Sequence, residues 1–139
     1  MPVQMTQSER ETFLADLHVG VLGIQRQNRG PLTVPIWYDY IPGGVVWMIT
    51  NQESIKGRLL KDVARISLCA QSEQPPYKYV SVEGTFAISP ATDAKLLHMA
   101  VRYLGEEQGK GYAAQGSGDG GIVVSITPES WLTVDYAKS

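Results

Sequence analysis

Residues Val45–Cys69 read VVWMITNQESIKGRLLKDVARISLC, and this stretch decides the fold. An apolar run of strand type ends at a polar turn, a short basic helix follows, and a second apolar run of strand type closes the stretch. The turn residues Asn51–Ser54 carry side chains that can cap a helix, and Ser54 stands immediately before it. The pattern therefore predicts a strand, a tight turn, a helix over 55–64 and another strand.

Two cations, Lys56 and Arg58, are expected in the first turn of this helix. The N-terminus of a helix already carries a partial charge of roughly +0.5, so cations normally favour the other end. An anion from outside the chain explains the two cations better, because free backbone N–H groups, a hydroxyl and two cations suit a phosphate. Ordinary solvated surface cations account for the same residues, and this stretch alone leaves both explanations open.

Composition limits the classes of protein to consider. With 139 residues, of which 43% are apolar, the chain is expected to form one domain over residues 1–139 with a modest core. The net charge of −2, without any block of like charge, argues against a nucleic acid or a membrane surface as the main partner. No apolar run approaches the ~20 residues of a membrane helix, and the first residues lack the apolar core of a signal peptide. Cys69 is the single cysteine, which excludes a disulfide within the chain, so a reducing cytoplasm is the expected location.

Local patterns predict further elements around the central stretch. Strands are expected over 18–26, 32–40, 45–50, 64–71, 77–88, 122–126 and 130–136, and helices over 6–17 and from Ser89–Pro90 to 104. Pro35 removes a ladder donor, so its strand is expected at a sheet edge or at a bulge, and Gly84 suggests a second bulge. The polar, glycine-rich segment Glu106–Gly121 is expected to be a mobile loop.

These elements indicate a mainly β fold with inserted helices. The turns that join the first three strands are too short for crossover helices, which disfavours a doubly wound α/β sheet. Six or seven mostly antiparallel strands are best accommodated in a small closed or partly open barrel, because closure removes exposed strand edges. A chain this small often completes its core by pairing with a copy of itself.

No catalytic side chain or metal centre is evident in the sequence. The two histidines, His18 and His98, stand apart from other metal ligands, so no zinc or iron site is expected, and His98 is expected on a helix surface or at an interface. Cys69 lies in an apolar strand pattern and is expected to be a core residue rather than a nucleophile. The glycine-rich run 116–121 does not lead from a strand into a helix, so it is not a phosphate-binding motif. It is expected to be a flexible loop, and a lid is the alternative.

Aromatic side chains on three predicted strands accompany the anion site. They are Trp37, Trp47 and the aromatics of Tyr77–Tyr79. Together with a phosphate site they suit a large planar ligand that carries a phosphate, although simple core packing explains aromatics in strands equally, above all for Trp47. A chain without a nucleophile or an acid–base pair can still do chemistry when a cofactor supplies it.

Two segments resemble the flavin-reductase-like split β-barrels, which are relatives of pyridoxamine 5′-phosphate oxidase. They are ITNQESIKGRLLKDVARISL (Ile49–Leu68) and PPYKYVSVEG (Pro75–Gly84). The resemblance extends from the first strand through Ile126, and its most specific parts are the Ser-x-Lys step and the Tyr-x-x-x-Glu-Gly strand. Within that superfamily the chain is most similar to the actinobacterial branch that binds the deazaflavin coenzyme F420, because it is short and has the Pro-x-Trp strand of Pro35 and Trp37.

This resemblance implies an FMN-binding split β-barrel fold and a homodimer whose cofactor lies in a groove shared between the subunits. The implied phosphate ligands are Ser54, Lys56 and Arg58. The ring would be lined by Thr50, Ile55 and the backbone near Pro35 and Trp37. Tyr77, Lys78 and Tyr79 would come from the partner subunit or from the facing wall. The implied activity is hydride transfer from reduced deazaflavin to an organic acceptor, in which Tyr79 or Lys78 could donate a proton.

Several alternatives remain open at this point. FMN is the alternative cofactor, and a non-catalytic protein that stores or carries the cofactor is the alternative function. The polyglutamate tail of the deazaflavin coenzyme would require further cations, for which Lys61, Arg65 and Lys78 are candidates, although all three suit ordinary surface positions. Pyridoxamine phosphate oxidation is not expected, because the C-terminal residues 131–139 lack the Arg–His pair that binds that substrate, and no histidine is placed for haem degradation. The sequence does not identify the acceptor.

Overall fold

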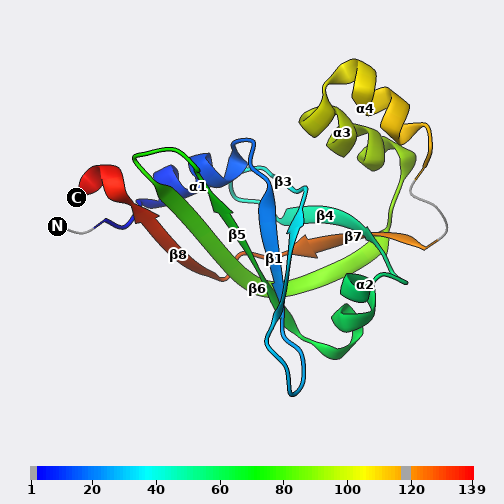
Figure 1. Ribbon diagram of the computed structural model, residues 1–139, viewed down its shortest axis with the longest axis horizontal. Helices are drawn as coiled ribbons and strands as arrows, with labels where there is room; N and C mark the ends of the chain where they lie inside the picture. Colours follow the sequence, from blue (N-terminus) through cyan, green and yellow to red (C-terminus); the bar gives the residue numbers. More distant parts are fainter. Residues whose placement is uncertain (1–2, 117–119) are drawn as a thin grey trace.

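The computed structural model describes residues 3–116 and 120–139, and its strands form one curled antiparallel sheet (Figure 1). The strands are β1 (Gly20–Ile24), β2 (Leu32–Ile36), β3 (Asp39–Tyr40), β4 (Val46–Asn51), β5 (Arg65–Gln71), β6 (Lys78–Pro90), β7 (Gly121–Ile126) and β8 (Ser130–Asp135). The α-helices are α1 (Gln7–Ala15), α2 (Ile55–Leu59), α3 (Asp93–Leu104) and α4 (Glu106–Ala113), and short 3₁₀ helices cover Leu60–Asp62 and Tyr136–Lys138. The predicted mainly β half-barrel is confirmed, with eight strands among the described residues.

The long strand β6 organises the sheet. Lys78–Glu83 of this strand pairs with β8, Phe86–Pro90 pairs with β7, and β5 pairs along the other edge. The strand order is β2-β1-β5-β6-β7-β4-β3, with β8 beside β6. The sheet therefore has two halves that share β6: a first half-sheet with β2, β1, β5 and β8, and a second half-sheet with β7, β4 and β3.

Gly84 marks the point on β6 where the pairing partner changes from β8 to β7. A Cβ atom added to Gly84 would lie 1.8 Å from the carbonyl oxygen of Thr127, in the connection between β7 and β8. The register between β5 and β6 is continuous here, with Ile66 opposite Gly84. On the other edge the register shifts by one residue, since Phe86 is opposite Ile126 but Glu83 is opposite Ser130. The irregularity predicted at Gly84 is therefore present on that edge, with the extra residue in the connection between β7 and β8, and the glycine admits this backbone.

The predicted strand over 32–40 divides into two strands in different halves of the sheet. β2 pairs with β1, and β3 pairs with β4, so the chain changes half-sheet at Trp37 and Tyr38. β2 ends the strand order, which confirms the edge position predicted for Pro35. Alternation alone does not reveal such a change of partner, because both strands keep the same period of two.

The helices differ from prediction mainly at their boundaries. The capping box at Thr6 and Glu9 is confirmed at the start of α1. Ser89 and Pro90 continue β6 opposite β7, so the helix expected to begin there starts instead at Asp93, with Thr92 as its N-cap.

The mobile loop expected over Glu106–Gly121 is wrong for its first half, where α4 is present. A Cβ atom on Gly109 would lie 2.7 Å from the backbone of Val101, so this glycine allows α4 to pack closely on α3. The rest of that prediction and the lid alternative include residues 117–119, which lie outside the described residues.

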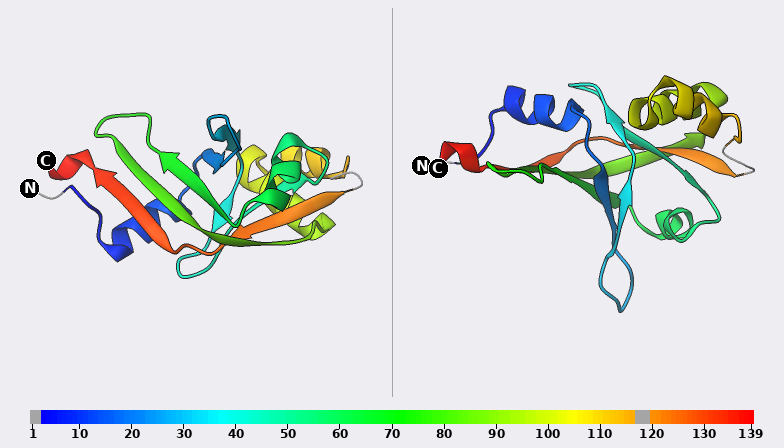
Figure 2. Two further views of the ribbon diagram at one scale, coloured as in Figure 1. Left: turned by 90° about the horizontal axis from the view of Figure 1, so that it is seen from below. Right: turned by 45° about the horizontal axis from the view of Figure 1, so that its top comes forward.

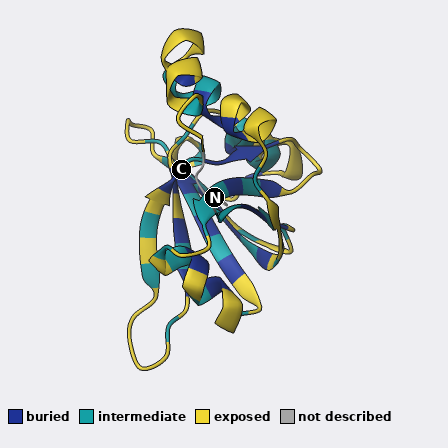
Figure 3. Ribbon diagram, turned by 90° about the vertical axis from the view of Figure 1, so that its right-hand side faces the viewer, coloured by how far each residue is buried: buried dark blue, intermediate teal, exposed yellow. Residues whose placement is uncertain are grey.

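Apolar side chains that alternate along the strands form the core. The buried members include Leu22, Ile24, Leu68, Val80, Val82, Val46, Met48, Val124 and Ile126. α1 contributes Leu14, which is fully buried. Figure 3 shows buried positions along the strands, whereas the β1–β2 loop at the bottom is exposed. Burial of each such side chain contributes ~1.5–3 kcal/mol, which holds the strand ends that carry the candidate site in place.

Candidate functional site

The β4–α2 turn brings together the predicted phosphate and ring ligands Thr50, Ser54, Ile55, Lys56 and Arg58. The Ser54 hydroxyl accepts a hydrogen bond from the amide N–H of Gly57 at 3.0 Å, which confirms Ser54 as the cap of α2. The same hydroxyl donates to the carbonyl oxygen of Asn51 at 2.6 Å. The hydroxyl proton of Ser54 is therefore donated to a group of the same turn and not to an external ligand.

Thr50 is the second hydroxyl of the turn. Its Oγ1 lies 3.2 Å from Oγ of Ser54. Because the Ser54 proton is directed to the carbonyl oxygen of Asn51, the Thr50 hydroxyl is the donor in this contact, and it would have to turn away from Ser54 to donate to an external anion.

The two cations of α2 have different surroundings. The Nε–H of Arg58 donates to the carbonyl oxygen of Glu53 at 3.0 Å, and the side chain is exposed. Lys56 is partly buried and forms no ion pair with any residue in the described part of the chain. Arg58 likewise forms no ion pair with a described residue, so an external anion could compensate either charge, and Lys56 differs in being partly buried.

The predicted extent of the helix, 55–64, is wrong, because α2 has only five residues before the chain continues as a 3₁₀ helix. In so short a helix Lys56 and Arg58 belong to the last turn as well as to the first. The helix dipole therefore gives no reason to call their positions unusual, and the case for an anion depends on the individual contacts.

Gly57 shapes the candidate site through a close backbone approach that the sequence patterns did not predict. A Cβ atom added there would lie 2.3 Å from the carbonyl oxygen of Asn51 and 2.6 Å from the Cα of Gln52. The turn and the helix thus touch backbone to backbone, which holds Lys56 at a fixed distance from β4. A glycine between two cations was the available signal for this close approach.

The indole of Trp37 lies in an aromatic cluster with α3 and α4. Trp37 stacks on Tyr103 with ring centroids 4.9 Å apart and planes 6° apart, and it lies 5.6 Å from Tyr112. A small pocket of about 70 Å³ adjoins this cluster. Its lining residues are Trp37, Ile49, Leu96, Met99, Ala100 and Tyr112.

The Trp37 cluster and the β4–α2 turn lie on opposite faces of β4. Ile49 faces the pocket beside Trp37, whereas Thr50, the next residue, contacts Ser54. Successive side chains of a strand point to opposite faces. Within one chain the Trp37 indole is therefore separated from Lys56 by the strand, and the ring-lining role predicted for the backbone near Pro35 and Trp37 stays a prediction.

The predicted residues Tyr77, Lys78 and Tyr79 lie far from the β4–α2 turn within one chain. β5 runs from the end of the α2 segment at Arg65 to Gln71, which pairs with Tyr79. A strand of seven residues spans about 20 Å, so the two groups lie at opposite ends of it (Figure 1). One chain alone does not bring them together.

A row of side chains, exposed except at the half-buried Cys69 and Ser81, crosses the outer face of the first half-sheet. In register, this row contains Pro35, Val21, Cys69, Ser81 and Leu132. Val21 is 41% exposed and Leu132 is 62% exposed. The predicted site residue Pro35 therefore belongs to an apolar sheet face that the described chain leaves uncovered.

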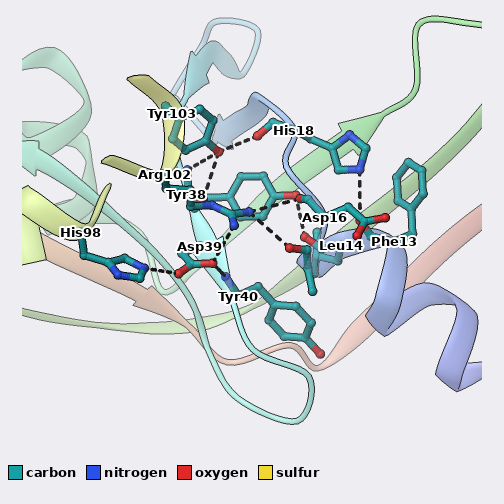
Figure 4. A network of polar contacts seen from close by, with 11 residues as sticks. Phe13, Leu14, Asp16, His18, Tyr38, Asp39, Tyr40, His98, Arg102 and Tyr103 are labelled. Atoms are coloured by element: carbon teal, nitrogen blue, oxygen red, sulfur yellow. Dashed lines mark hydrogen bonds and ion pairs between the residues drawn. The ribbon is translucent and has the colours of Figure 1, made fainter. Parts of the chain in front are cut away.

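Asp39 is the centre of a polar cluster that joins α3 to β3 (Figure 4). Its carboxylate lies 2.6 Å from Nε2 of His98 and 3.3 Å from a terminal nitrogen of Arg102, and it accepts the amide N–H of Tyr40 at 2.8 Å. Asp39 itself is 9% exposed. His98 is thus on the helix surface, as predicted, but it also has a buried carboxylate as its partner, which the sequence did not indicate.

Arg102 and Tyr103 extend this cluster to the backbone. Arg102 donates to the carbonyl oxygen of Tyr38 at 3.0 Å and to that of Asp16 at 3.2 Å. The Tyr103 hydroxyl accepts the amide N–H of Tyr38 and donates toward the carbonyl oxygen of His18. Burial raises the pKa of Tyr103, so its hydroxyl remains protonated and continues to donate. The cluster holds α3 in place, and it thereby positions Tyr103, the ring on which Trp37 stacks.

The described residues include neither a cluster of metal ligands nor an activated thiol. Within residues 3–116 and 120–139, no group of three or more His, Cys, Asp or Glu side chains is arranged to hold a metal ion. Burial raises the pKa of the Cys69 thiol, which lowers its thiolate fraction. Among the described residues, no helix is long and apolar enough to span a membrane.

Solved structures with the same fold support the resemblance seen in the sequence. A conserved hypothetical protein from Mycobacterium tuberculosis, Rv2991, is 22% identical, with a TM-score of 0.77 over 98% of this chain and 88% of that chain. An F420 reductase is 22% identical, with a TM-score of 0.72 over 88% of this chain and 94% of that chain. A putative pyridoxamine 5′-phosphate oxidase from Listeria innocua is 12% identical, with a TM-score of 0.70 over 91% of this chain and 96% of that chain.

No protein-family model and no curated protein sequence matches the chain. At these low identities the structural likeness shows the fold, and it confirms the split-barrel architecture that the two sequence segments predict. What the site binds follows from its own chemistry.

Proposed function

We propose that this chain is an oxidoreductase that binds reduced coenzyme F420 and passes a hydride to an organic acceptor. The observation that carries the proposal is Lys56, a partly buried cation without an ion-pair partner in the described chain. It stands on a turn held rigid by Ser54 and Gly57, beside the Thr50 hydroxyl. A phosphate would accept charge-assisted hydrogen bonds from these groups. The fold is shared with an F420 reductase and also with a FAD-binding protein, so it suits a deazaflavin or a flavin, and the Pro-x-Trp strand is the reason to choose the deazaflavin.

In this proposal the coenzyme supplies the hydride, and the chain supplies binding, orientation and exclusion of water. Lys56 holds the phosphate, Arg58 adds a second positive charge nearby, and the Thr50 hydroxyl joins them once it turns from Ser54 to the phosphate. Ser54 supports the turn rather than contacting the phosphate with its proton. Ile55 is 66% exposed beside these ligands, and it offers an apolar surface to the ring.

A second copy of the chain completes the groove in this proposal. Tyr77, Lys78 and Tyr79 are too far from Lys56 to serve the same cofactor within one subunit, whereas the partner subunit could supply them. The uncovered apolar row that includes Val21 and Leu132 gives the two copies a surface to bury. Tyr79 or Lys78 of the second copy would then be the candidate proton donor to the reduced acceptor.

The test of the cofactor site is Lys56→Gln. A charge-assisted hydrogen bond contributes about 1.5–3 kcal/mol, so the affinity for the deazaflavin should fall about 10–100-fold while the fold is retained. Lys110→Gln, which removes an exposed cation from α4, is the matched control and should leave the affinity nearly unchanged. Titration of each protein, followed by tryptophan fluorescence, measures both. An unchanged dissociation constant in Lys56→Gln removes the proposed phosphate site.

FMN is the alternative cofactor, because it also combines a planar ring with a phosphate. Parallel titrations separate the two: micromolar affinity for FMN without a response to the deazaflavin would reverse the choice. A cofactor carrier is the alternative function. A carrier would bind reduced deazaflavin without accelerating its oxidation by any member of a panel of quinones, enones and tetrapyrroles, whereas an oxidoreductase would accelerate it with at least one.

A further inference from the structure

A pocket of about 280 Å³ lies between α1 and the end of the sheet where β6 begins and β8 ends. Figure 2 (right) shows α1 above this end of the sheet. Lys78 of β6 and Asp135 of β8 line the pocket from the sheet, and Thr12 and Phe13 line it from α1. Among the described residues that line it, none belongs to the β4–α2 turn.

Lys78 and Asp135 have opposite charges and lie directly opposite each other in the β6–β8 register. Opposite residues of an antiparallel pair have Cβ atoms roughly 4.5–5.5 Å apart, with both side chains on the same face of the sheet. Neither side chain nevertheless forms an ion pair, with the other or with any other residue in the described part of the chain. The two charged groups therefore line one pocket without neutralising each other.

The Asp135 carboxylate lies in a position where a charge is costly. Asp135 is only 8% exposed, and its Oδ1 accepts the amide N–H of Ala137 at 2.9 Å. Among the described residues, no second group donates a hydrogen bond to this carboxylate and no cation pairs with it. A buried carboxylate is unfavourable unless a cation compensates it, so its remaining oxygen suits a cationic group of a ligand.

The other walls of the pocket indicate what else the ligand contains. Glu9 also lines the pocket, but its carboxylate is already paired with Nζ of Lys138 at 2.6 Å. Lys78 has no such partner, so it suits an anionic group of the same ligand. Met5 and Phe13 add an apolar wall. Ligand pockets in proteins measure roughly 300–1,000 Å³, so a pocket of about 280 Å³ suits a small molecule.

We propose that this pocket binds a small zwitterion of the amino-acid type. Its ammonium group pairs with Asp135, its carboxylate pairs with Lys78, and its apolar side chain contacts Met5 and Phe13. Lys78 and Tyr79 point to opposite faces of β6, so the pocket is separate from the outer face of the first half-sheet. This assignment leaves Tyr79 as the candidate proton donor in the proposed groove, and it does not depend on the proposed function.

The test titrates the protein, without any coenzyme, with three probes of matched shape and follows the amide chemical shifts. L-valine carries both charged groups, isobutylamine lacks the carboxylate, and isovalerate lacks the ammonium group. L-valine should bind saturably and about 10-fold or more tightly than either of the other two, because it alone makes both charge-assisted contacts.

Two variants assign each charged group of the ligand to its partner. Asp135→Asn retains an oxygen for the Ala137 amide, and it should weaken the binding of L-valine and isobutylamine about 10–100-fold without weakening that of isovalerate. Lys78→Met retains the apolar stem of the side chain. It should weaken the binding of L-valine and isovalerate by a similar factor without weakening that of isobutylamine.

The matched controls are Asp62→Asn and Lys110→Met, which remove an exposed acid and an exposed cation that do not line the pocket, and both should bind all three probes like the wild type. The amide spectrum shows whether each variant is folded, and if Asp135→Asn is not, the response of Lys78→Met to L-valine and isobutylamine decides. The proposal is overturned if L-valine does not bind saturably, if it binds no more tightly than isobutylamine, or if the folded variants bind L-valine as well as their controls.

Discussion

Gly57 sets the geometry of the β4–α2 turn through the side chain that it lacks. The neighbouring carbonyl oxygen of Asn51 occupies the space that a Cβ atom would need, at 2.3 Å. Any larger residue must push α2 away from β4. Lys56 and the Ser54 cap move with α2, so this position should couple stability to the proposed cofactor affinity.

We expect Gly57→Ala to lower the free energy of unfolding by about 1–3 kcal/mol, because a methyl group is forced into a packed backbone contact. The control is Gly111→Ala on α4, where an added Cβ atom has no neighbour within 4 Å. That change should be neutral or stabilise by about 0.5–1 kcal/mol, since alanine favours a helix. Denaturant titration measures both, and equal stability of the two variants would contradict the close packing of the turn.

Glu9 links α1 to the C-terminal 3₁₀ helix and makes this end of the chain sensitive to acid. Its hydrogen bond with Lys138, at 2.6 Å, lowers the pKa of Glu9 to about 2, with a further contribution from the Thr6 amide. A carboxylate with a lowered pKa stabilises the folded state above its ordinary pKa, and this contribution is lost as the pH falls from about 4.5 toward 2.

Stability measured across this range should therefore decline with falling pH, and Glu9→Gln should flatten the decline. Glutamine retains the capping hydrogen bond but does not titrate. Parallel pH profiles for the wild type and Glu9→Gln would argue against the Lys138 contact as the cause.

Among the elements, α3 depends on polar contacts at Asp39 as well as on its apolar face. Arg102 satisfies the Asp39 carboxylate on one side and backbone carbonyl oxygens on the other. These carbonyl groups belong to the end of α1 and to the point where the chain changes half-sheet, so one side chain connects three parts of the fold.

Arg102→Met should destabilise the protein by about 3 kcal/mol, because it leaves a buried carboxylate without its cation. Amide hydrogen exchange should locate the effect in α3. Lys110→Met on α4 removes an exposed cation of similar length and should change stability little, because exposed ion pairs contribute little. Equal effects of the two substitutions would show that Asp39 does not depend on Arg102.

Most strands could be predicted from alternation, whereas α4 could not. Its sequence contains Gly109 and Gly111, which disfavour a helix locally. Gly109 is present because α3 packs against it, and that contact joins residues from two helices, which local patterns do not report. The candidate site was predictable only in part for the same reason. The Ser54 cap depends on residues next to it in the sequence, so the sequence predicted it. The position of Trp37 on the other face of β4 depends on where the chain changes half-sheet, which local patterns do not report.

At the scale of the whole molecule, the outer face of the first half-sheet is the proposed contact with a second copy. The wild type should be a dimer at micromolar concentration by light scattering. Leu132→Glu should produce a monomer, because a charge placed in a buried apolar contact is costly.

Ile41→Glu is the matched control, since Ile41 is 75% exposed but lies outside that face, and it should remain a dimer. A wild-type monomer would leave Tyr77, Lys78 and Tyr79 without a route to the cofactor.

The ladder shared along β6 has a mechanical consequence. β6 pairs by hydrogen bonds with β8, β7 and β5. Neither half-sheet can therefore separate from β6 without weakening the other half-sheet. Heat or force should therefore melt the barrel in a single cooperative transition. The turn that holds Lys56 would then unfold together with the most distant strand, so no partly unfolded form would keep the proposed coenzyme site.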